Sequence, residues 1–277
     1  MRIDSHQHYW RIARGDYGWM TEAVAPIRRD LMPADLAPHL DAAGIAGTIL
    51  VQAAPTLAET EFLLDLAESD ARILGVVGWV DLAAPGATRE LERLARRPKF
   101  RGIRPMLQDI ADTFWILRPE AVAALEAAAA LGLRLDALAR PRHLPVVSAL
   151  ADRLPALPIV LDHCAKPDIA AGAMRPWARD IEALAERPQV FCKLSGLATE
   201  APPDWTVADL APYAATVLQA FGADRVMFGS DWPVLELAGT YPQWLAAAAE
   251  LVDRFAPDGA TAVFGGTAAR FYGPPAA

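Results

Sequence analysis

Cysteine is scarce in this chain of 277 residues, where only Cys164 and Cys192 occur, both in apolar, strand-like stretches. Two thiols do not make a disulfide framework, and no C-x-x-C pair is present to form a structural zinc site. The first residues, MRIDSHQHYW, lack a basic start followed by an apolar run, so no signal peptide is predicted. We therefore expect a cytoplasmic protein that is stabilised by its core.

The chain also lacks an excess of positive charge and long apolar runs. It has 26 basic and 34 acidic residues, a net charge of −8, which argues against nucleic acid as a partner. No run of about 18 apolar residues is free of charge and turn signals, so no membrane contact is expected. The G-x-S-x-G elbow of serine hydrolases and a Gly-rich nucleotide fingerprint after the first strand are both missing. With nucleic acid and membrane not expected as partners, the expected ligand is a small molecule.

What the chain does contain is a regular alternation of apolar, β-branched segments with helical ones. The apolar segments begin near Ile3, Ile45, Ile73, Arg101, Leu133, Pro158, Val190 and Arg225. Their spacing of roughly 30 residues suits one strand plus one helix. Eight such units without a break in composition predict an α/β fold, a single (β/α)8 TIM barrel over residues 1–277, since such a barrel needs about 250 residues. An open, doubly wound sheet is the alternative.

Two helical segments can be delimited from the sequence. Thr206–Phe221 begins with a capping box of Thr206 and Asp209, and Gly222 ends it. Thr56–Ser69 has an apolar face opposite four acidic residues that we expect to face water, Glu59, Glu61, Asp65 and Glu68.

Polar residues follow almost every predicted strand, although strands of a parallel barrel are buried and apolar. Side chains at the carboxyl ends of such strands point into one active-site mouth. This convergence is the main argument from the residues for an enzyme. The polar residues include Asp4, His6, His8, Gln52, Asp81, Arg104, Asp136, Asp162, His163, Lys166, Lys193, Ser195, Ser230 and Asp231.

Three histidines and an aspartate are the strongest candidates among them. His6 and His8 lie two residues apart on one strand face, so their imidazoles can hold one metal ion or one substrate. Asp231, in GSDWP, can ligate a metal or take a proton from water, although an N-cap for the next helix is the alternative. His163 ends the sixth strand, and Lys166 follows it with a positive charge for an oxyanion or a substrate carboxylate.

Other residues are candidates for substrate contacts. Arg101 and Arg104 are three residues apart, so a regular strand cannot direct both into the mouth, and Arg104 is nearer the strand end. Lys193 and Ser195 share a face, and contacts with substrate or with the barrel are equally open. Further candidates are Gln52 and three tryptophans able to stack on a sugar ring, Trp19, Trp79 and Trp232. His39, in a helical stretch, is expected to be a surface or packing residue, and His143 lies outside the core set.

Five motifs together resemble a known family. They are DSHQHYW at 4–10, RGIRPMLQD at 101–109, LDHCAKP at 161–167, CKLSGL at 192–197 and MFGSDWPV at 227–234. The chain is similar to the sugar-lactonase group of the amidohydrolase superfamily, which includes L-fucono- and L-rhamnono-lactonases, 2-pyrone-4,6-dicarboxylate lactonase and 4-sulfomuconolactonase. The resemblance extends to GGTAARFYG at 265–273. It implies a (β/α)8 barrel that hydrolyses a cyclic ester.

The resemblance also implies roles for individual residues. His6, His8 and Asp231 match the ligands of one divalent metal ion, with zinc the first choice, while some members of the group are expected to work without a metal. His163 and Asp231 match catalytic groups, and two basic residues match substrate contacts, Lys166 and Arg104.

The chain departs from the metal-rich amidohydrolases at two strands. Those relatives place a histidine at the end of strand five and a lysine or glutamate on strand four, where this chain has Asp136 and Arg104. A two-metal centre is therefore not expected. Sugar-lactonase relatives often have a histidine where this chain has Pro105, which leaves the identity of the sugar open.

The expected reaction is opening of a sugar-derived lactone by water. Asp231 would take a proton from the water and return it to the leaving alkoxide, while His163 and Lys166 or a metal stabilise the oxyanion. The alternatives are a lactonase for dicarboxylate lactones, a metal-dependent decarboxylase on the same barrel, and a non-catalytic binder of small molecules.

Overall fold

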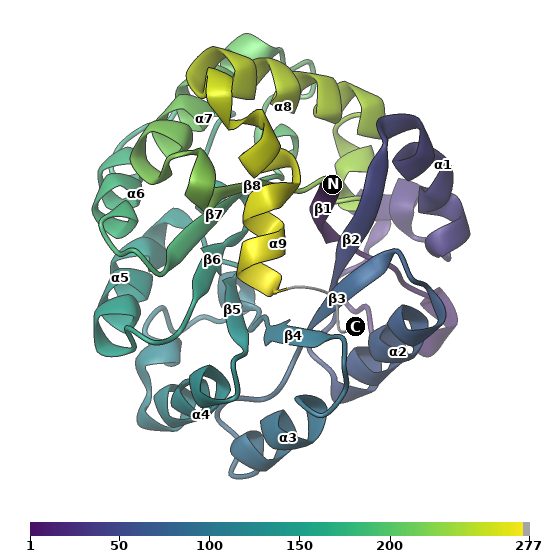
Figure 1. Cartoon of the computed structure of the whole chain (residues 1–277), viewed down its shortest axis with the longest axis vertical. Helices are drawn as coiled ribbons and strands as arrows, with labels where there is room; N and C mark the ends of the chain where they lie inside the picture. The colour runs from purple at the N-terminus through teal and green to yellow at the C-terminus, as the bar shows by residue number, and fades with distance from the viewer. Residues whose placement is uncertain (274–277) are drawn as a thin grey trace.

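Eight parallel strands, each paired with the next along the chain, form the centre of the computed structural model, which describes residues 1–273 (Figure 1). Strand β1 also meets β8, because Gln7 pairs in parallel with Trp232 and the His8 amide donates to the Trp232 carbonyl at 2.8 Å. The sheet thus curls into a barrel, which confirms the predicted (β/α)8 TIM barrel. The strands are β1 Arg2–Gln7, β2 Ile45–Val51, β3 Ile73–Gly78, β4 Phe100–Ile103, β5 Arg134–Ala137, β6 Ile159–Leu161, β7 Val190–Leu194 and β8 Val226–Phe228.

Among the described residues, eight α-helices surround the barrel, one after each strand, and a ninth crosses it (Figure 1). The predicted strand starts agree with the structure, since Ile45, Ile73 and Val190 are the first residues of β2, β3 and β7. The helices are α1 Pro33–Ala43, α2 Leu57–Ser69, α3 Ala87–Leu94, α4 Pro119–Ala130, α5 Leu144–Arg153, α6 Trp177–Ala185, α7 Val207–Phe221, α8 Tyr241–Phe255 and α9 Thr267–Tyr272.

Helix α9 covers the amino-terminal end of the barrel (Figure 1). The segment that precedes it packs against the start of β1, so closely that a Cβ at Gly265 would lie 2.1 Å from the Met1 carbonyl oxygen. Phe271 and Tyr272 pack with inward-facing residues of five strands in a second core cluster, separate from the core between sheet and helices. The inward-facing residues are Ile3, Ile49, Val51, Val77, Val160 and Met227. The packed side chains of this cluster therefore close the floor of the barrel.

Helix α7 has the predicted caps, but one prediction for α2 is wrong. The Asp209 carboxylate accepts a hydrogen bond from the Thr206 amide at 2.8 Å, and α7 ends before Gly222. In α2, Glu59 is fully buried instead of facing water. Its carboxylate accepts hydrogen bonds from the amides of Ala53 and Ala54, which follow β2. Periodicity alone does not reveal this, because the first turn of a helix can fold a side chain back onto the preceding loop.

Two further observations concern the cysteines and the helices. Both cysteines are free and buried. Over residues 1–273, the structure contains no helix with the length and apolar character needed to cross a membrane.

Candidate functional site

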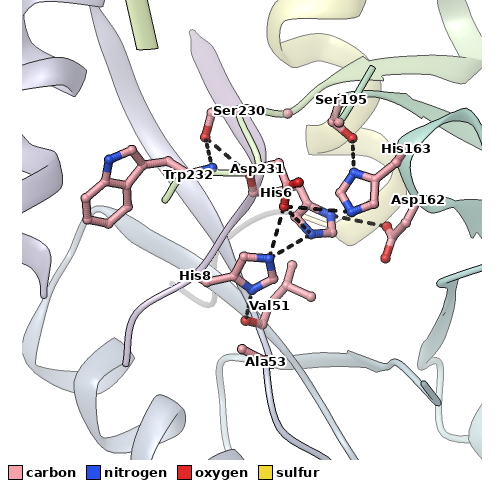
Figure 2. A network of polar contacts seen from close by, with 12 residues as sticks. His6, His8, Val51, Ala53, Asp162, His163, Ser195, Ser230, Asp231 and Trp232 are labelled. Carbon is pink, nitrogen blue, oxygen red and sulfur yellow. Dashed lines mark hydrogen bonds and ion pairs between the residues drawn. The ribbon is translucent and has the colours of Figure 1, made fainter. Parts of the chain in front are cut away.

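Four side chains from three strand ends meet at the carboxyl end of the barrel (Figure 2). His6 and His8 come from β1, His163 follows β6 and Asp231 follows β8. Oδ1 of Asp231 lies 3.2 Å from Nε2 of His8 and 3.7 Å from Nε2 of both His6 and His163. All four residues are at most 3% exposed. The structure therefore brings together the four residues that the sequence singled out.

The outer nitrogens of the two β1 histidines have acceptor partners. Nδ1 of His8 lies 2.8 Å from the Val51 carbonyl oxygen, which can only accept, so the proton is on Nδ1 and the Nε2 lone pair faces Asp231. Nδ1 of His6 lies 3.2 Å from Oδ1 of Asp162, which favours the same tautomer, and 3.1 Å from the Lys193 ammonium, which favours the other. The Arg104 guanidinium, which can only donate, lies 3.4 Å from Nε2 of His6 and so favours a lone pair on that nitrogen. Both Nε2 atoms can therefore act as ligands or acceptors.

His163 is held by an unusual backbone segment. Residues 163–166 all have left-handed conformations, with φ between 50° and 58°, although none of them is glycine. Such conformations cost about 1–3 kcal/mol each and persist only where the surroundings impose them. The Trp177 indole donates to the Cys164 carbonyl at 2.8 Å, and Oγ of Ser195 lies 2.9 Å from Nδ1 of His163. These contacts fix His163 and Lys166 at the mouth.

A buried charged network lies beneath His6. Nζ of Lys193 donates to Asp136 and lies 3.0 Å from Oδ1 of Asp162 and 3.1 Å from Nδ1 of His6. Tyr272, from α9, donates to the same Asp136 carboxylate at 2.8 Å. Lys193 is fully buried. Of the two roles left open for Lys193, the structure shows contacts within the barrel.

Burial has the largest effect on the protonation of His6 and His163. Burial, followed by the nearby Lys193 ammonium, lowers the pKa of His6 well below its ordinary value. Burial also lowers the pKa of His163 to about 4. For Asp231, burial alone would raise the pKa, but the neighbouring imidazoles of His163, His8 and His6 outweigh it and hold the pKa below its ordinary value. At neutral pH the imidazoles of His6 and His163 are thus neutral, and the Asp231 carboxylate is ionised.

A cavity of about 230 Å³ opens over this carboxylate. Arg104 and Lys166 provide its positive charges, while Trp19 and Leu138 belong to its apolar lining. Its other polar lining includes His8, Gln108, Asp109, His163 and Asp231. This volume suits a small ligand.

Each of the two cations already has an acidic partner. Nζ of Lys166 lies 3.1 Å from Oε1 of Glu200. The Arg104 guanidinium donates to Asp162 at 3.3 Å and to the Gln52 carbonyl, and the Gln52 amide in turn donates to the Arg104 carbonyl at 2.7 Å. Gln52 therefore both accepts a hydrogen bond from Arg104 and donates one to it, and it is not part of the cavity lining.

The remaining predicted residues lie elsewhere. Trp232 points away from the histidines, and its indole donates to Glu236 at 2.8 Å (Figure 2). Trp79 lines a neighbouring cavity. His143 is buried, and its Nδ1 accepts a hydrogen bond from the Arg140 amide at 3.0 Å, which makes it a structural cap. On α1, the His39 ring packs on a tyrosine ring of α8, as expected for a packing residue.

Asp162 contacts the site but has no role predicted from the sequence. It follows β6 directly, in LDH, and its carboxylate reaches His6, Lys193 and Arg104. The only sequence signal for a role of Asp162 is its position beside His163 at the end of a predicted strand. Its partners come from three other strands, and only the closed barrel brings these strands together.

The donor set suits one divalent metal ion. His6, His163 and Asp231 each offer a ligand atom, and these atoms lie within 4.8 Å of one another. Nε2 of His8 is also 3.2 Å from Nε2 of His6, so the predicted set of His6, His8 and Asp231 converges on the same point. Neutral imidazoles and a carboxylate are common ligands of zinc and similar ions.

Comparison with known proteins places this geometry in a family. Residues 3–273 match the amidohydrolase family. The chain is 48% identical to an L-fucono-1,5-lactonase of Burkholderia ambifaria, over 98% of this chain and 95% of that protein. It is 41% identical to an L-fucono-1,5-lactonase of Burkholderia multivorans, over 99% of this chain and 97% of that protein. A Burkholderia multivorans amidohydrolase crystallised with bound Zn has a TM-score of 0.94 at 39% identity, covering 99% of this chain and 100% of its own. With the predicted barrel, the strand-end histidines and Asp231 all in place, this chain belongs to the amidohydrolase family.

Proposed function

We propose that the protein hydrolyses a sugar-derived lactone, such as an L-fucono-lactone, an L-rhamnono-lactone or a related aldonolactone. One observation carries this proposal: a buried carboxylate, Asp231, lies within 3.7 Å of three imidazole nitrogens at the edge of a cavity. Near-full-length identity of 48% with an L-fucono-1,5-lactonase supports the choice of substrate class.

Asp231 acts as the general base in this proposal. Its lowered pKa keeps it ionised at neutral pH, so it can accept a proton from water that attacks the lactone carbonyl. When the tetrahedral intermediate collapses, the same group returns the proton to the ring oxygen that leaves as an alkoxide. No covalent enzyme intermediate is needed, since a strained cyclic ester is already reactive.

His163 and Lys166 stabilise the negative oxygen that forms. When the Ser195 hydroxyl donates to Nδ1 of His163, the ring proton is on Nε2 and can be donated to the oxyanion. One such donor contributes about 3 kcal/mol to the transition state. When the Ser195 hydroxyl instead accepts a hydrogen bond from Nδ1 of His163, the Nε2 lone pair of this histidine is free to act as a metal ligand.

The same donor set supports one zinc ion held by His6, His8 and Asp231, with His163 within reach. Such an ion would supply Lewis-acid polarisation of the lactone carbonyl. Val51 and Asp162 orient the two β1 histidines for this task through their Nδ1 atoms.

A neutral lactone suits the cavity better than a dicarboxylate. Both cations of the lining are already paired, Lys166 with Glu200 and Arg104 with Asp162. A carboxylate on the substrate would have to displace one of these partners and would also approach Asp231. We propose that the enzyme acts in the cytoplasm, where its two buried thiols stay reduced.

The proposal is tested by acid release from purified protein. L-fucono-, L-rhamnono- and dicarboxylate lactones are assayed with a pH indicator, with and without a chelator. We expect hydrolysis of a neutral sugar lactone, and a loss of at least about a thousandfold in kcat for Asp231→Asn, the scale of removing a central catalytic group. Asp168→Asn, which removes an exposed carboxylate near the mouth, is the matched control and should stay within about twofold.

Two outcomes would contradict the proposal. Near-normal hydrolysis by Asp231→Asn would remove the assigned base. Failure to open any lactone, together with CO2 release from an aromatic carboxylic acid by the metal-loaded protein, would establish a decarboxylase instead.

A further inference from the structure

Two tryptophans differ from the other six in their hydrogen bonding. Trp10, Trp19, Trp177, Trp205, Trp232 and Trp244 each donate the indole N–H to a protein oxygen. Across residues 1–273, no acceptor is found for the indole N–H of Trp79 or Trp115, the remaining two of the eight. Both side chains are partly buried, and neither indole nitrogen is among the fully buried atoms that lack a partner, so solvent or a ligand can reach these two donors.

Both of these tryptophans line the same cavity. It has a volume of about 270 Å³ and lies between the loop that follows β3 and the loop that follows β4. Asp81 and Asp109 also line it, and its lining among the described residues includes no lysine, arginine or histidine. The cavity lining therefore combines two tryptophans without a protein acceptor for their indole N–H and two carboxylates, of which that of Asp81 also accepts a hydrogen bond from the Ala83 amide at 3.1 Å.

The second cavity adjoins the candidate active site. Met106 and Asp109 line both cavities, so only the segment around these residues separates them. Sδ of Met106 lies 3.2 Å from the Gln52 side-chain amide, and a methionine side chain is a flexible wall. A ligand with two linked rings can therefore reach both cavities across Met106.

We propose that the Trp79–Trp115 cavity binds a second, neutral sugar ring attached to the lactone substrate. A pyranose ring presents C–H faces that pack on indoles, and hydroxyls that accept from N–H groups and donate to carboxylates. The two aspartates disfavour an anionic group, and a purely apolar group would leave the N–H donors unused. This inference rests on the proposed lactonase function, and it extends the substrate class from monosaccharide to disaccharide lactones.

The test compares matched lactones. The 1,5-lactones of L-fucose and of disaccharides with L-fucose at the reducing end, carrying D-galactose on O2, O3 or O4, are assayed by acid release. We expect at least one disaccharide lactone to have a kcat/KM about tenfold above that of L-fucono-1,5-lactone, because stacking and two hydrogen bonds are added. Trp115→Ala should remove this advantage, and Trp115→Phe, which keeps a ring but has no N–H, should retain part of it.

Controls separate this inference from the proposed function. Phe114→Ala removes an adjacent ring that is 65% exposed and outside the cavity lining, so it should leave the advantage unchanged. Hydrolysis of the monosaccharide lactone by each variant shows that it is folded. If that lactone is hydrolysed but no disaccharide lactone is preferred, or if the preference survives in Trp115→Ala, the second subsite is refuted alone. If no lactone is opened, the proposed function and this inference fail together.

Discussion

Gly196 leaves the space that the His163 ring occupies. A Cβ at this position would lie 2.6 Å from Cγ and Nδ1 of the ring, and the φ of +61° already disfavours any other residue. Gly196→Ala should therefore displace the imidazole from Ser195 and from Asp231. Misplacement of a catalytic group by about 1 Å can cost about a hundredfold, so we expect kcat for lactone hydrolysis to fall by that order.

A variant at a second glycine, Gly132, separates the effect of a steric contact with His163 from the effect of backbone strain. Gly132 has a φ of +72°, but a Cβ there would meet no atom within 4 Å. Gly132→Ala should cost about 1 kcal/mol of stability and leave kcat unchanged. Equal kcat values for the two variants, measured on folded protein, would show that Gly196 does not position His163.

The strand-end candidates could be predicted residue by residue, but their supporting partners could not. His6, His8, His163 and Asp231 each stand out as a polar residue after an apolar strand, and the closed barrel brings them together. The partner of a given side chain depends on strand register and rotamer. For that reason the Trp232 ring, expected to contact substrate, points away from the site (Figure 2).

At the scale of elements, the start of α2 predicts a pH dependence of stability. Burial raises the pKa of Glu59 to about 7, from an ordinary 4.5, despite the hydrogen bonds from Ala54 and Ala53. Between about pH 4.5 and 7 the folded chain holds this proton and the unfolded chain does not. The free energy of unfolding should therefore fall as pH rises through this window, by about 3 kcal/mol from this group.

Urea titrations at pH 5 and pH 8 measure this loss. Other buried acids contribute in the same direction, since burial also raises the pKa of Asp4 and Asp136 to about 6. The difference between wild type and Glu59→Gln isolates the share of Glu59, and Glu92→Gln, on an exposed position of α3, is the control. An unchanged pH dependence in Glu59→Gln would contradict the prediction.

Regular elements were predictable because caps and periodicity are local signals, as Thr206 and Gly222 of α7 illustrate. The left-handed segment 163–166 has no such signal. Its residues have no intrinsic preference for positive φ, and contacts with Trp177 and Ser195 impose the conformation. Local sequence therefore predicts α7 better than the segment that positions His163.

At the scale of the molecule, a bound metal would link strands that are far apart in sequence. Its ligands would come from β1 and the end of β8, with His163 at the end of β6 within reach. Only the folded chain assembles this set, so binding should stabilise the fold. A free metal concentration one hundred times Kd would contribute about 2.7 kcal/mol. Removal of metal with a chelator should then lower Tm by roughly 5–10 °C for a chain of this size.

Calorimetry of the same protein before and after readdition of zinc checks this prediction. In Asp231→Asn, which has lost a shared ligand, the shift should be much smaller. A Tm that does not respond to zinc in the wild type would show that the donor set is not a metal site under those conditions.

The architecture could be predicted because eight units of similar length have few alternatives to a barrel. The ninth helix could not, since α9 lies outside the repeating units and its place under the barrel depends on tertiary contacts. Tyr272 is the clearest case, because its hydroxyl reaches Asp136 from below.

The meeting of β1 and β8 has a consequence for synthesis on the ribosome. His6 and His8 emerge more than 200 residues before Asp231 and Tyr272. Until then the amino-terminal histidines have no carboxylate to face, and the edge of β1 has no partner on one side. In nascent chains the barrel should therefore close late, when β8 becomes available to pair with β1. Until then, folding requires that β1 does not pair with another strand.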